Sequence, residues 1–280
     1  MSVSSGSGER LFAILDLFTE DRLEWTPQEI MAELGYTRPT LYRYLRTLKD
    51  AGFLTSLPGR GFTLGPRVVE LDFLVRRSDP VVDIGREQVQ LLANRYPCSS
   101  LLVRYYGKKL LCVHSACSIP DPRSSYPRGR PMPLARGAIS RAILANLPRR
   151  QQKPIIAEAL EDFTEIEIGS TVEDILDSMR GIRRRGYSIA HGEVTPGVVG
   201  IAAPVFDSGR LPIAALCVTI AETALEARGL AEEEIAEAVR EAAAEISYEL
   251  AELQHDTTEF NDHKPAGGRN NSLIAQGENT

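Results

Sequence analysis

Cysteines, long apolar runs and a basic leader are scarce or missing in this chain. The 280 residues contain four cysteines, too few for a disulfide framework in a chain of this length. No apolar run approaches the roughly 20 residues that span a bilayer, since the longest, 211–221, is interrupted by Pro212. Residues 1–8 are mostly Ser and Gly and do not resemble a secretory signal. We therefore expect a soluble, cytoplasmic protein with no membrane partner.

Positive charge is in the minority but is unevenly distributed. The chain has 32 Lys and Arg against 38 Asp and Glu, a net charge of −6, which argues against a basic coat over the whole surface. Between Tyr36 and Arg67, however, six cations face a single anion, Asp50. A basic segment in an acidic chain is typical of a small nucleic-acid reader joined to a larger domain. The alternative is a solvated helix face with unpaired arginines.

The length corresponds to about two domains, and the first has the pattern of a winged helix-turn-helix. Helical spacing of apolar residues predicts three short helices at 9–18, 27–34 and 37–52. Two β-rich runs, 53–55 and 62–64, then flank a glycine-containing turn. We predict a flexible leader at 1–8, a winged helix-turn-helix domain at 9–66 and a linker helix at 67–79.

The second predicted domain, 80–253, mixes helices and strands. Helical patterns occur at 81–96, 134–147, 171–185 and 230–253. Strand patterns occur at 99–106, 110–116, 199–206 and 212–220. Two of the turns between strands are hairpin signals, so we expect an antiparallel sheet flanked by helices and an α+β fold class overall. Residues 254–280 are polar and are predicted to be a disordered tail.

Three stretches of the sequence together carry a resemblance to a known family: Thr40–Leu54, Pro133–Ala145 and Gly186–Asp207. They resemble the recognition helix, the pocket-opening helix and the pocket loop with its strand of the IclR-type bacterial transcriptional regulators. The likeness extends from about Leu11 to Leu253. It implies a DNA-binding, ligand-responsive regulator with a GAF-like effector domain and no cofactor. Ala135 and Ser140-Arg141 depart from the His and Gly-Lys common in the family, so the polar lining of the pocket is expected to differ.

The third predicted helix supplies the candidate DNA contacts. If Leu41, Leu45 and Leu48 face the core, its arginines lie on the opposite face. The front of such a helix enters the major groove, where arginine pairs with guanine. The predicted DNA-binding residues are Thr37, Arg38, Thr40, Tyr42, Arg43, Arg46 and Arg60. Arg60 is placed at the wing, Arg46 at phosphates, and Thr37 either at phosphate or, in preference, as the helix cap. A pseudo-palindromic operator and a homodimer or dimer of dimers follow from one helix reading few bases.

The effector site is implied by the resemblance. The matching positions are Ala138, Ile139, Ala190, His191, Gly200, Cys217 and Thr219, and the implied ligand is a small organic acid or aromatic compound. Backbone N–H groups at a helix N-terminus favour a carboxylate. Cys217 and Thr219 share one strand face, which is either pocket lining or ordinary core.

Other interpretations use residues outside this scheme. Cys112, His114 and Cys117 have metal-ligand chemistry but no fourth ligand at a suitable spacing, so we predict no metal site. Ser188 or Ser140 with His191 and Glu193 would suit a hydrolase of small acids, with the winged helix binding a protein, but no Gly-x-Ser-x-Gly elbow is present and no catalytic residue is predicted. A second basic run, 123–150, fits a solvated surface, an interface or attraction of an anionic effector.

Overall fold

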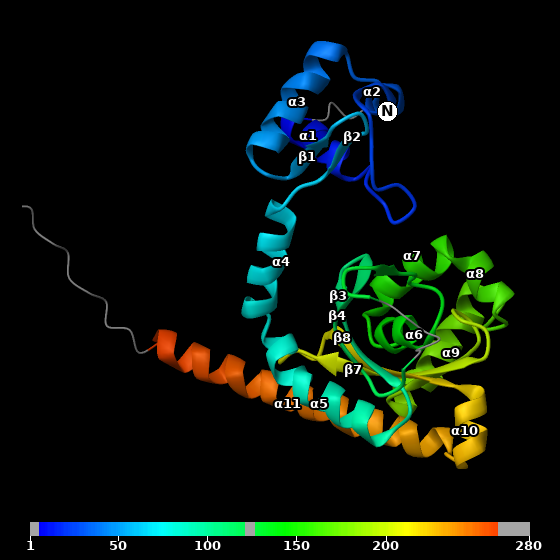
Figure 1. Ribbon diagram of the computed structural model, residues 1–280. Helices are drawn as coiled ribbons and strands as arrows, with labels where there is room; N and C mark the ends of the chain where they lie inside the picture. The colour runs from blue at the N-terminus through cyan, green and yellow to red at the C-terminus, as the bar shows by residue number, and fades with distance from the viewer. Residues whose placement is uncertain (1–5, 121–126, 263–280) are drawn as a thin grey trace, which may run out of the picture. The chain divides into compact units, whose positions relative to one another are not determined.

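The structure is a computed structural model that describes residues 6–120 and 127–262. The chain divides into two compact units, residues 1–79 and 80–280 (Figure 1). Within the described residues, no helix is both long and apolar enough to cross a membrane.

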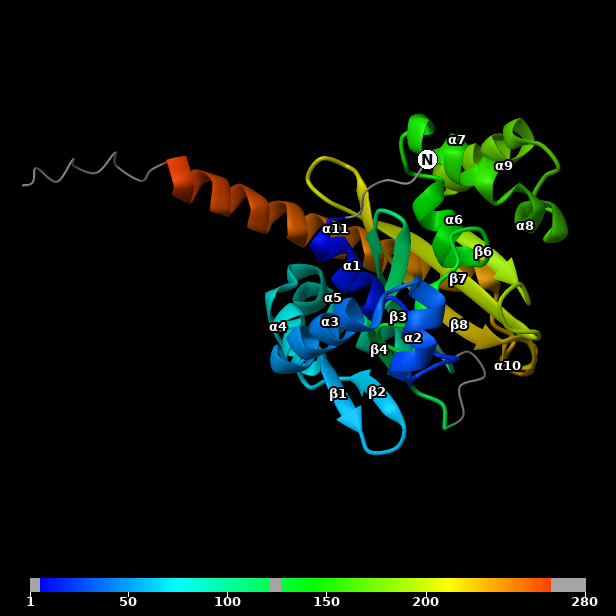
Figure 2. The same cartoon turned by 90° about the horizontal axis from the view of Figure 1, so that it is seen from above.

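Unit 1 consists of three helices, a β-hairpin and a closing helix. The elements are α1 (Ser7–Leu15), α2 (Pro27–Leu34), α3 (Arg38–Asp50), β1 (Leu54–Leu57), β2 (Gly61–Leu64) and α4 (Arg67–Ser78). Helix α2 starts where the Thr26 hydroxyl accepts the Glu29 N–H, and it ends at Gly35, whose φ is +66°. Figure 2 shows the hairpin extending beyond the three helices of this unit. The predicted winged helix-turn-helix is confirmed.

The hairpin is attached to the helices through the segment before α2. Trp25 and Phe62 exchange two backbone hydrogen bonds, at 3.0 and 2.8 Å, and the indole N–H of Trp25 donates to the Leu17 carbonyl at 2.9 Å. Gly61 has a φ of +104°, and a Cβ there would lie 2.3 Å from the Trp25 carbonyl oxygen. Glycine is therefore required at the point where the wing meets the helices.

Unit 2 is built on a six-stranded antiparallel sheet with the order β5-β4-β3-β8-β7-β6. The strands are β3 (Ser99–Tyr106), β4 (Lys109–Cys117), β5 (Pro131–Met132), β6 (Ser188–His191), β7 (Val198–Phe206) and β8 (Pro212–Ala221). The central strands β3, β7 and β8 are mostly buried, because helices cover both faces of the sheet.

The two faces of the sheet form two separate cores. Figure 1 shows α5 and α11 side by side on one face and α6 to α9 grouped on the other. The helices are α5 (Pro80–Arg95), α6 (Ala138–Leu144), α7 (Arg149–Glu158), α8 (Leu160–Glu165), α9 (Val172–Arg185), α10 (Glu222–Arg228) and α11 (Glu232–Asp262). Alternate residues of β8 serve each side: Leu216 and Val218 pack with α11, and Ala215 and Cys217 with α6. The α+β antiparallel-sheet architecture is confirmed.

Several predicted boundaries differ from the structure. Helix α11 continues to Asp262, so the prediction of disorder from 254 is wrong for 254–262. No glycine or proline interrupts that stretch, and the next proline is Pro265. Residues 263–280 lie outside the described residues. Helix α1 begins inside the predicted leader, because the Glu9 carboxylate accepts the Gly6 N–H; residues 1–5 are not described.

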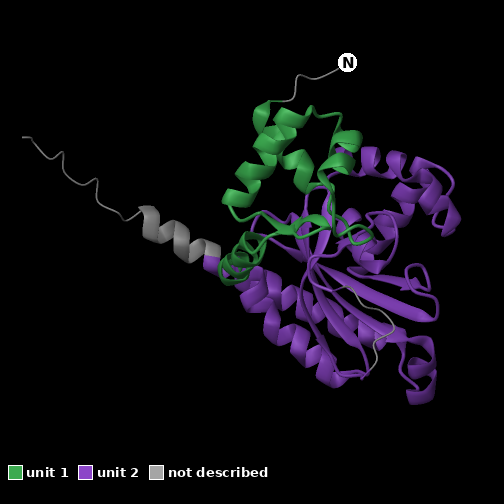
Figure 3. Ribbon diagram, turned by 45° about the horizontal axis from the view of Figure 1, so that its top comes forward, with its two compact units in different colours: residues 1–79 green, residues 80–280 purple. Residues whose placement is uncertain are grey.

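Helices α7 and α8 are absent from the sequence prediction. The segment is highly charged and α7 contains Pro154, a residue that normally ends a helix. In Figure 3 the two units are coloured separately, with α4 ending unit 1 and α5 beginning unit 2.

Candidate functional sites

Helix α3 carries a basic, solvent-exposed face. Its buried residues are Leu41, Tyr44, Leu45 and Leu48. Predicted contact residues Arg38, Tyr42, Arg43 and Arg46 are all exposed. The inward side was predicted without Tyr44, whose ring meets that of Tyr36 edge-on with centroids 6.0 Å apart. The helix therefore presents its arginines on one accessible surface.

Among the described residues, these arginines make a few side-chain contacts while remaining exposed themselves. The Arg38 guanidinium carbon lies 5.6 Å from the Tyr42 ring centroid and that of Arg43 lies 5.2 Å from the Tyr44 centroid. Arg46 lies 3.6 Å from the Asp50 carboxylate in an exposed i,i+4 pair. Exposed pairs of this kind contribute little stability, so each guanidinium is accessible to a phosphate or a base edge.

The two threonines at the start of α3 bond to each other. Thr37 occupies the N-cap position, but its hydroxyl makes no capping hydrogen bond and donates to the Thr40 hydroxyl at 3.0 Å. The expected capping role of Thr37 is therefore wrong. Pro39, in the first turn, has no N–H to be capped.

The wing arginine has an acidic neighbour that the sequence did not reveal. Arg60 lies in the hairpin turn, and its guanidinium is 2.5 Å from the Glu24 carboxylate, with Arg60 largely exposed. Glu24 precedes Trp25, which pairs with the wing strand. Any anion that approaches Arg60 competes with Glu24 for the same cation.

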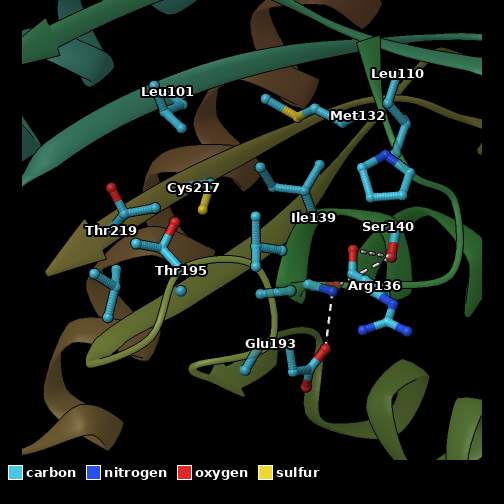
Figure 4. A pocket seen from close by; sticks show the side chains of 17 residues that line it. Leu101, Leu110, Met132, Arg136, Ile139, Ser140, Glu193, Thr195, Cys217 and Thr219 are labelled. Atoms are coloured by element: carbon cyan, nitrogen blue, oxygen red, sulfur yellow. Dashed lines mark hydrogen bonds between the residues drawn. The ribbon is translucent and has the colours of Figure 1, made fainter. Parts of the chain in front are cut away.

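In unit 2 a small pocket lies between the sheet and the start of α6 (Figure 4). Its volume is about 50 Å³, where one water needs about 10–15 Å³. Six of the seven predicted effector residues line it: Ala138, Ile139, Ala190, Gly200, Cys217 and Thr219. Sequence segments 80 residues apart are thus brought to one cavity.

Strand register explains why these residues meet. Gly200 pairs with Ala190 on one side and with Thr219 on the other, so all three face α6. A Cβ added at Gly200 would lie 3.7 Å from the Ala138 side chain. A methyl group at this position would therefore make an ordinary van der Waals contact with Ala138, and glycine leaves that part of the pocket unfilled.

His191 lies outside this pocket, contrary to expectation. It follows Ala190 on β6 and is exposed, whereas Ala190 is buried, because side chains alternate along a strand. Its Nε2 lies 3.0 Å from the Glu232 carboxylate at the start of α11.

The largest feature missed by the sequence analysis is a buried ion pair beside the pocket. The Arg141 guanidinium lies 2.5 Å from the Glu193 carboxylate, and the side chains are only 3% and 12% exposed. Arg141 also donates to the Ile189 carbonyl at 2.8 Å, and Glu193 accepts the Gly137 N–H at 2.9 Å. The loop between β6 and β7 is thereby fastened to the beginning of α6.

Gly137 is needed where this loop approaches. Its φ is +87°, and a Cβ there would lie 3.0 Å from the Val194 side chain. Because Glu193 already accepts the Gly137 N–H, that amide is not available to an effector carboxylate in this arrangement.

The rest of the lining is apolar or weakly polar. Cys217 is a free, buried thiol, and burial raises its pKa, which keeps it protonated. The Thr219 hydroxyl donates to the Ser99 carbonyl at 3.4 Å. Figure 4 shows Cys217, Thr219 and Thr195 around the cavity with Leu101 and Met132. This composition suits a small ligand with an apolar body and a few hydrogen-bonding groups.

Much of the second basic run is neutralised by acids. Arg136 pairs with Asp162, at 3.1 Å, and with Glu165. Arg149 lies 2.9 Å from Glu173. Arg123 lies outside the described residues.

The structure does not bring the hydrolase residues together. The Ser140 hydroxyl donates to the carbonyls of Arg136 and Gly137, Ser188 is fully buried, and His191 pairs with Glu232. No group of three metal-ligating side chains occurs among the described residues.

A winged helix with an exposed arginine face, joined to a sheet domain with a small pocket, is the arrangement of DNA-binding transcriptional regulators. Comparisons place the chain within that class. Residues 98–248 match the family described as "Bacterial transcriptional regulator IclR C-terminal". Residues 7–58 match the "IclR helix-turn-helix domain". The chain belongs to the IclR family of bacterial transcriptional regulators.

Relatives agree over most of the chain. It is 28% identical over 218 residues to the probable HTH-type transcriptional regulator ArcR of Halobacterium salinarum, covering 76% of this chain and 82% of that one. It is 28% identical over 255 residues to the glycerol operon regulatory protein of Streptomyces coelicolor, covering 86% and 95%. These relatives and the matched family are transcriptional regulators, not enzymes.

Solved structures show the same fold. An IclR transcriptional regulator from Alicyclobacillus acidocaldarius superposes with a TM-score of 0.72 at 23% identity, covering 89% of this chain and 100% of that one. An IclR homolog from Microbacterium hydrocarbonoxydans, complexed with 4-hydroxybenzoate, gives 0.71 at 21% identity, covering 88% and 99%.

Proposed function

We propose that this protein is a ligand-responsive regulator that binds a pseudo-palindromic DNA operator as a homo-oligomer in the cytoplasm and senses a small organic metabolite. The observation that carries the proposal is the presence of two sites in one chain: exposed arginines on α3, and a small, mainly apolar pocket in unit 2. Ligand in the pocket changes operator affinity, which is a coupling between two distinct sites.

Arginines of α3 are assigned to the DNA contacts. Arg38, Tyr42 and Arg43, at the front of the helix, are proposed to meet base edges in the major groove. Arg46 and the wing residue Arg60 are proposed to meet phosphates, with Thr37 and Thr40 hydroxyls nearby. The exposure of all these side chains supports the assignment, except that Thr40 is half-buried.

Self-association is supported by an apolar surface on α4. None of its residues is buried, even though several are apolar: Val69 is 72% exposed and Phe73 is 56% exposed. Leu74, Val75 and, on α1, Phe12 are exposed as well. Clustered apolar side chains in water mark interaction surfaces. We propose that this surface joins copies of the chain into a dimer or a dimer of dimers.

The effector is proposed to be a small organic acid or aromatic compound. The apolar pocket and its hydroxyl and thiol groups support a compact ligand of this kind. The fold neighbour from Microbacterium hydrocarbonoxydans holds 4-hydroxybenzoate, an aromatic acid. The residues proposed to contact the effector are Ala138, Ile139, Ala190, Gly200, Cys217 and Thr219.

A metabolite screen followed by DNA binding tests the proposal. Small acids and aromatics are first screened for a shift in thermal unfolding of the full chain. Each hit is then added to anisotropy titrations with DNA fragments from the gene's own neighbourhood. We expect one fragment to bind preferentially, with an affinity that falls steeply with salt and changes with the hit. Absence of any fragment preference, in dilute buffer and with every hit present, contradicts the proposal.

A further inference from the structure

A second hollow in unit 2 is lined by arginines and shares no residue with the effector pocket. Its volume is about 800 Å³. The arginines come from three places: Arg183, Arg184 and Arg185 end α9, Arg210 lies in the turn between β7 and β8, and Arg240 belongs to α11. Asp207 is the one acidic residue in the lining.

Two of the five arginines are engaged in hydrogen bonds to neighbouring residues of the protein. Arg183 donates to the Ala145 carbonyl at 2.6 Å and to the Leu147 carbonyl at 3.3 Å. Arg240 makes two hydrogen bonds to the Glu237 carboxylate, at 2.8 and 2.6 Å. Arg183 keeps its charge without a carboxylate partner in the described structure, whereas Arg240 is neutralised.

The other three arginines are exposed and have no carboxylate partner among the described residues. Arg185 packs its guanidinium 5.7 Å from the Tyr187 ring centroid; Arg184 and Arg210 have neither an acidic nor an aromatic contact in that part of the chain. Asp207, whose Oδ1 accepts the Leu211 N–H at 2.8 Å within its own turn, offsets only one of these positive charges. The hollow therefore carries a concentrated positive charge on a protein whose net charge is −6.

Arg210 also occupies an unfavourable backbone conformation. Its φ is +58°, in the left-handed region where glycine is preferred. A large cationic side chain thus stands where the backbone alone would favour glycine, and it borders the hollow.

We propose that this hollow is a binding site for a small polyanion that carries two or more phosphate or carboxylate groups. Guanidinium groups bind such oxygens through paired hydrogen bonds, and arginines converging from separate elements match a ligand with more than one anionic group. The volume lies within the range of about 300–1,000 Å³ typical of small-molecule sites. The chain therefore has two ligand sites, one mainly apolar and one cationic.

Calorimetric titration of the full chain tests this site. Inorganic pyrophosphate and citrate are titrated separately at low ionic strength, so that phosphate and carboxylate recognition are distinguished. The test variant is Arg184→Gln/Arg210→Gln, which removes two exposed charges whose side chains make no ion pair within residues 6–120 and 127–262. The matched control, Arg150→Gln/Arg228→Gln, removes two exposed arginines outside the hollow.

We expect saturable one-site binding of at least one probe to the wild-type chain. The test variant weakens this binding at least tenfold and the control changes it less than twofold. Equal weakening by the two variants means attraction to net charge alone and overturns the proposal, as does the lack of saturable binding of both probes. Sedimentation of the same samples gives a further criterion: loss of an oligomer in the test variant alone assigns the hollow to a contact between copies and also overturns it.

Discussion

The two units put their candidate sites in opposite physical settings. In unit 1 the arginines of α3 are in water, on the far side of the helix from Leu41, Leu45 and Leu48. In unit 2 the pocket lies within the packed layer between the sheet and α6, where Cys217 and Ala138 are buried. Electrostatic recognition uses a surface, whereas recognition of a small apolar ligand needs enclosure.

Because of this difference, substitutions in the two units are expected to affect stability and function differently. An α3 arginine can be removed with little loss of stability, because its contacts are exposed. A pocket residue belongs to the fold as well as to the site, so its removal lowers stability together with function. The largest losses of stability are therefore expected at buried positions, and the largest losses of DNA binding at exposed ones.

Arg141→Met is expected to have the largest effect, on stability. It leaves the Glu193 carboxylate buried without its cation, which costs about 3–5 kcal/mol. Chemical denaturation followed by circular dichroism measures the loss. Arg149→Met breaks the exposed pair with Glu173 and should cost at most about 1 kcal/mol. Similar losses of unfolding free energy from the two variants would contradict the conclusion that the buried Arg141–Glu193 pair holds the loop between β6 and β7 in place.

Gly61→Ala tests whether a position in unit 1 can lose as much stability on substitution as a position beside the pocket. The new Cβ would overlap the Trp25 carbonyl, and we expect a loss of about 2–3 kcal/mol in the unfolding of unit 1. Gly59→Ala is the control: its φ is +74° but no atom lies within 4 Å of the added Cβ, so only the backbone cost of about 1 kcal/mol applies. A lower thermal midpoint for Gly59→Ala than for Gly61→Ala would contradict this account of the wing.

Arg43→Ala is expected to remove specific DNA binding and to leave the fold intact. Loss of one bidentate base contact costs about 1–3 kcal/mol, which makes the operator complex about 5- to 150-fold weaker, as measured by anisotropy. The thermal midpoint and any ligand-induced shift should not change. Arg228→Ala, an exposed arginine of unit 2, serves as control. Retained operator preference in Arg43→Ala would mean that another face of α3 reads the DNA.

Thr219→Leu is expected to weaken ligand binding without changing DNA binding. The added carbon atoms occupy a cavity of about 50 Å³, so the dissociation constant of a screening hit should rise at least tenfold while ligand-free DNA affinity is unchanged. Titration of ligand, followed by thermal shift, measures this. Thr223→Leu, on the exposed side of α10, is the control. An unaltered ligand response would remove Thr219 from the site.

The local features of this protein were predictable from sequence. The inward face of α3 follows from the spacing of Leu41, Leu45 and Leu48, and the cap of α2 from Thr26 and Glu29. Both depend on contacts within a few residues along the chain. The boundary of α11 was misjudged because polar composition was taken to end a helix that no proline or glycine interrupts.

Features that depend on tertiary contacts were not predictable in the same way. The pairing of Glu193 with Arg141 requires a loop to return to a helix about 50 residues earlier. His191 was misplaced because a shift of one residue along a strand moves a side chain to the other face. Arg60 was correctly located in the wing turn, but its pairing with Glu24 depends on how the preceding segment packs against the hairpin.

Strand β8 has a mechanical consequence. Cys217 and Thr219 touch the cavity, while Leu216, Val218 and Ile220, interleaved with them, press on the layer made by α5 and α11. A molecule that pushes the strand by a fraction of an ångström must displace that layer too, since close-packed interiors transmit strain rather than absorb it. Helix α5 begins at Pro80, the residue that follows Asp79 at the end of unit 1. The covalent junction is thus attached to the layer that the strand moves.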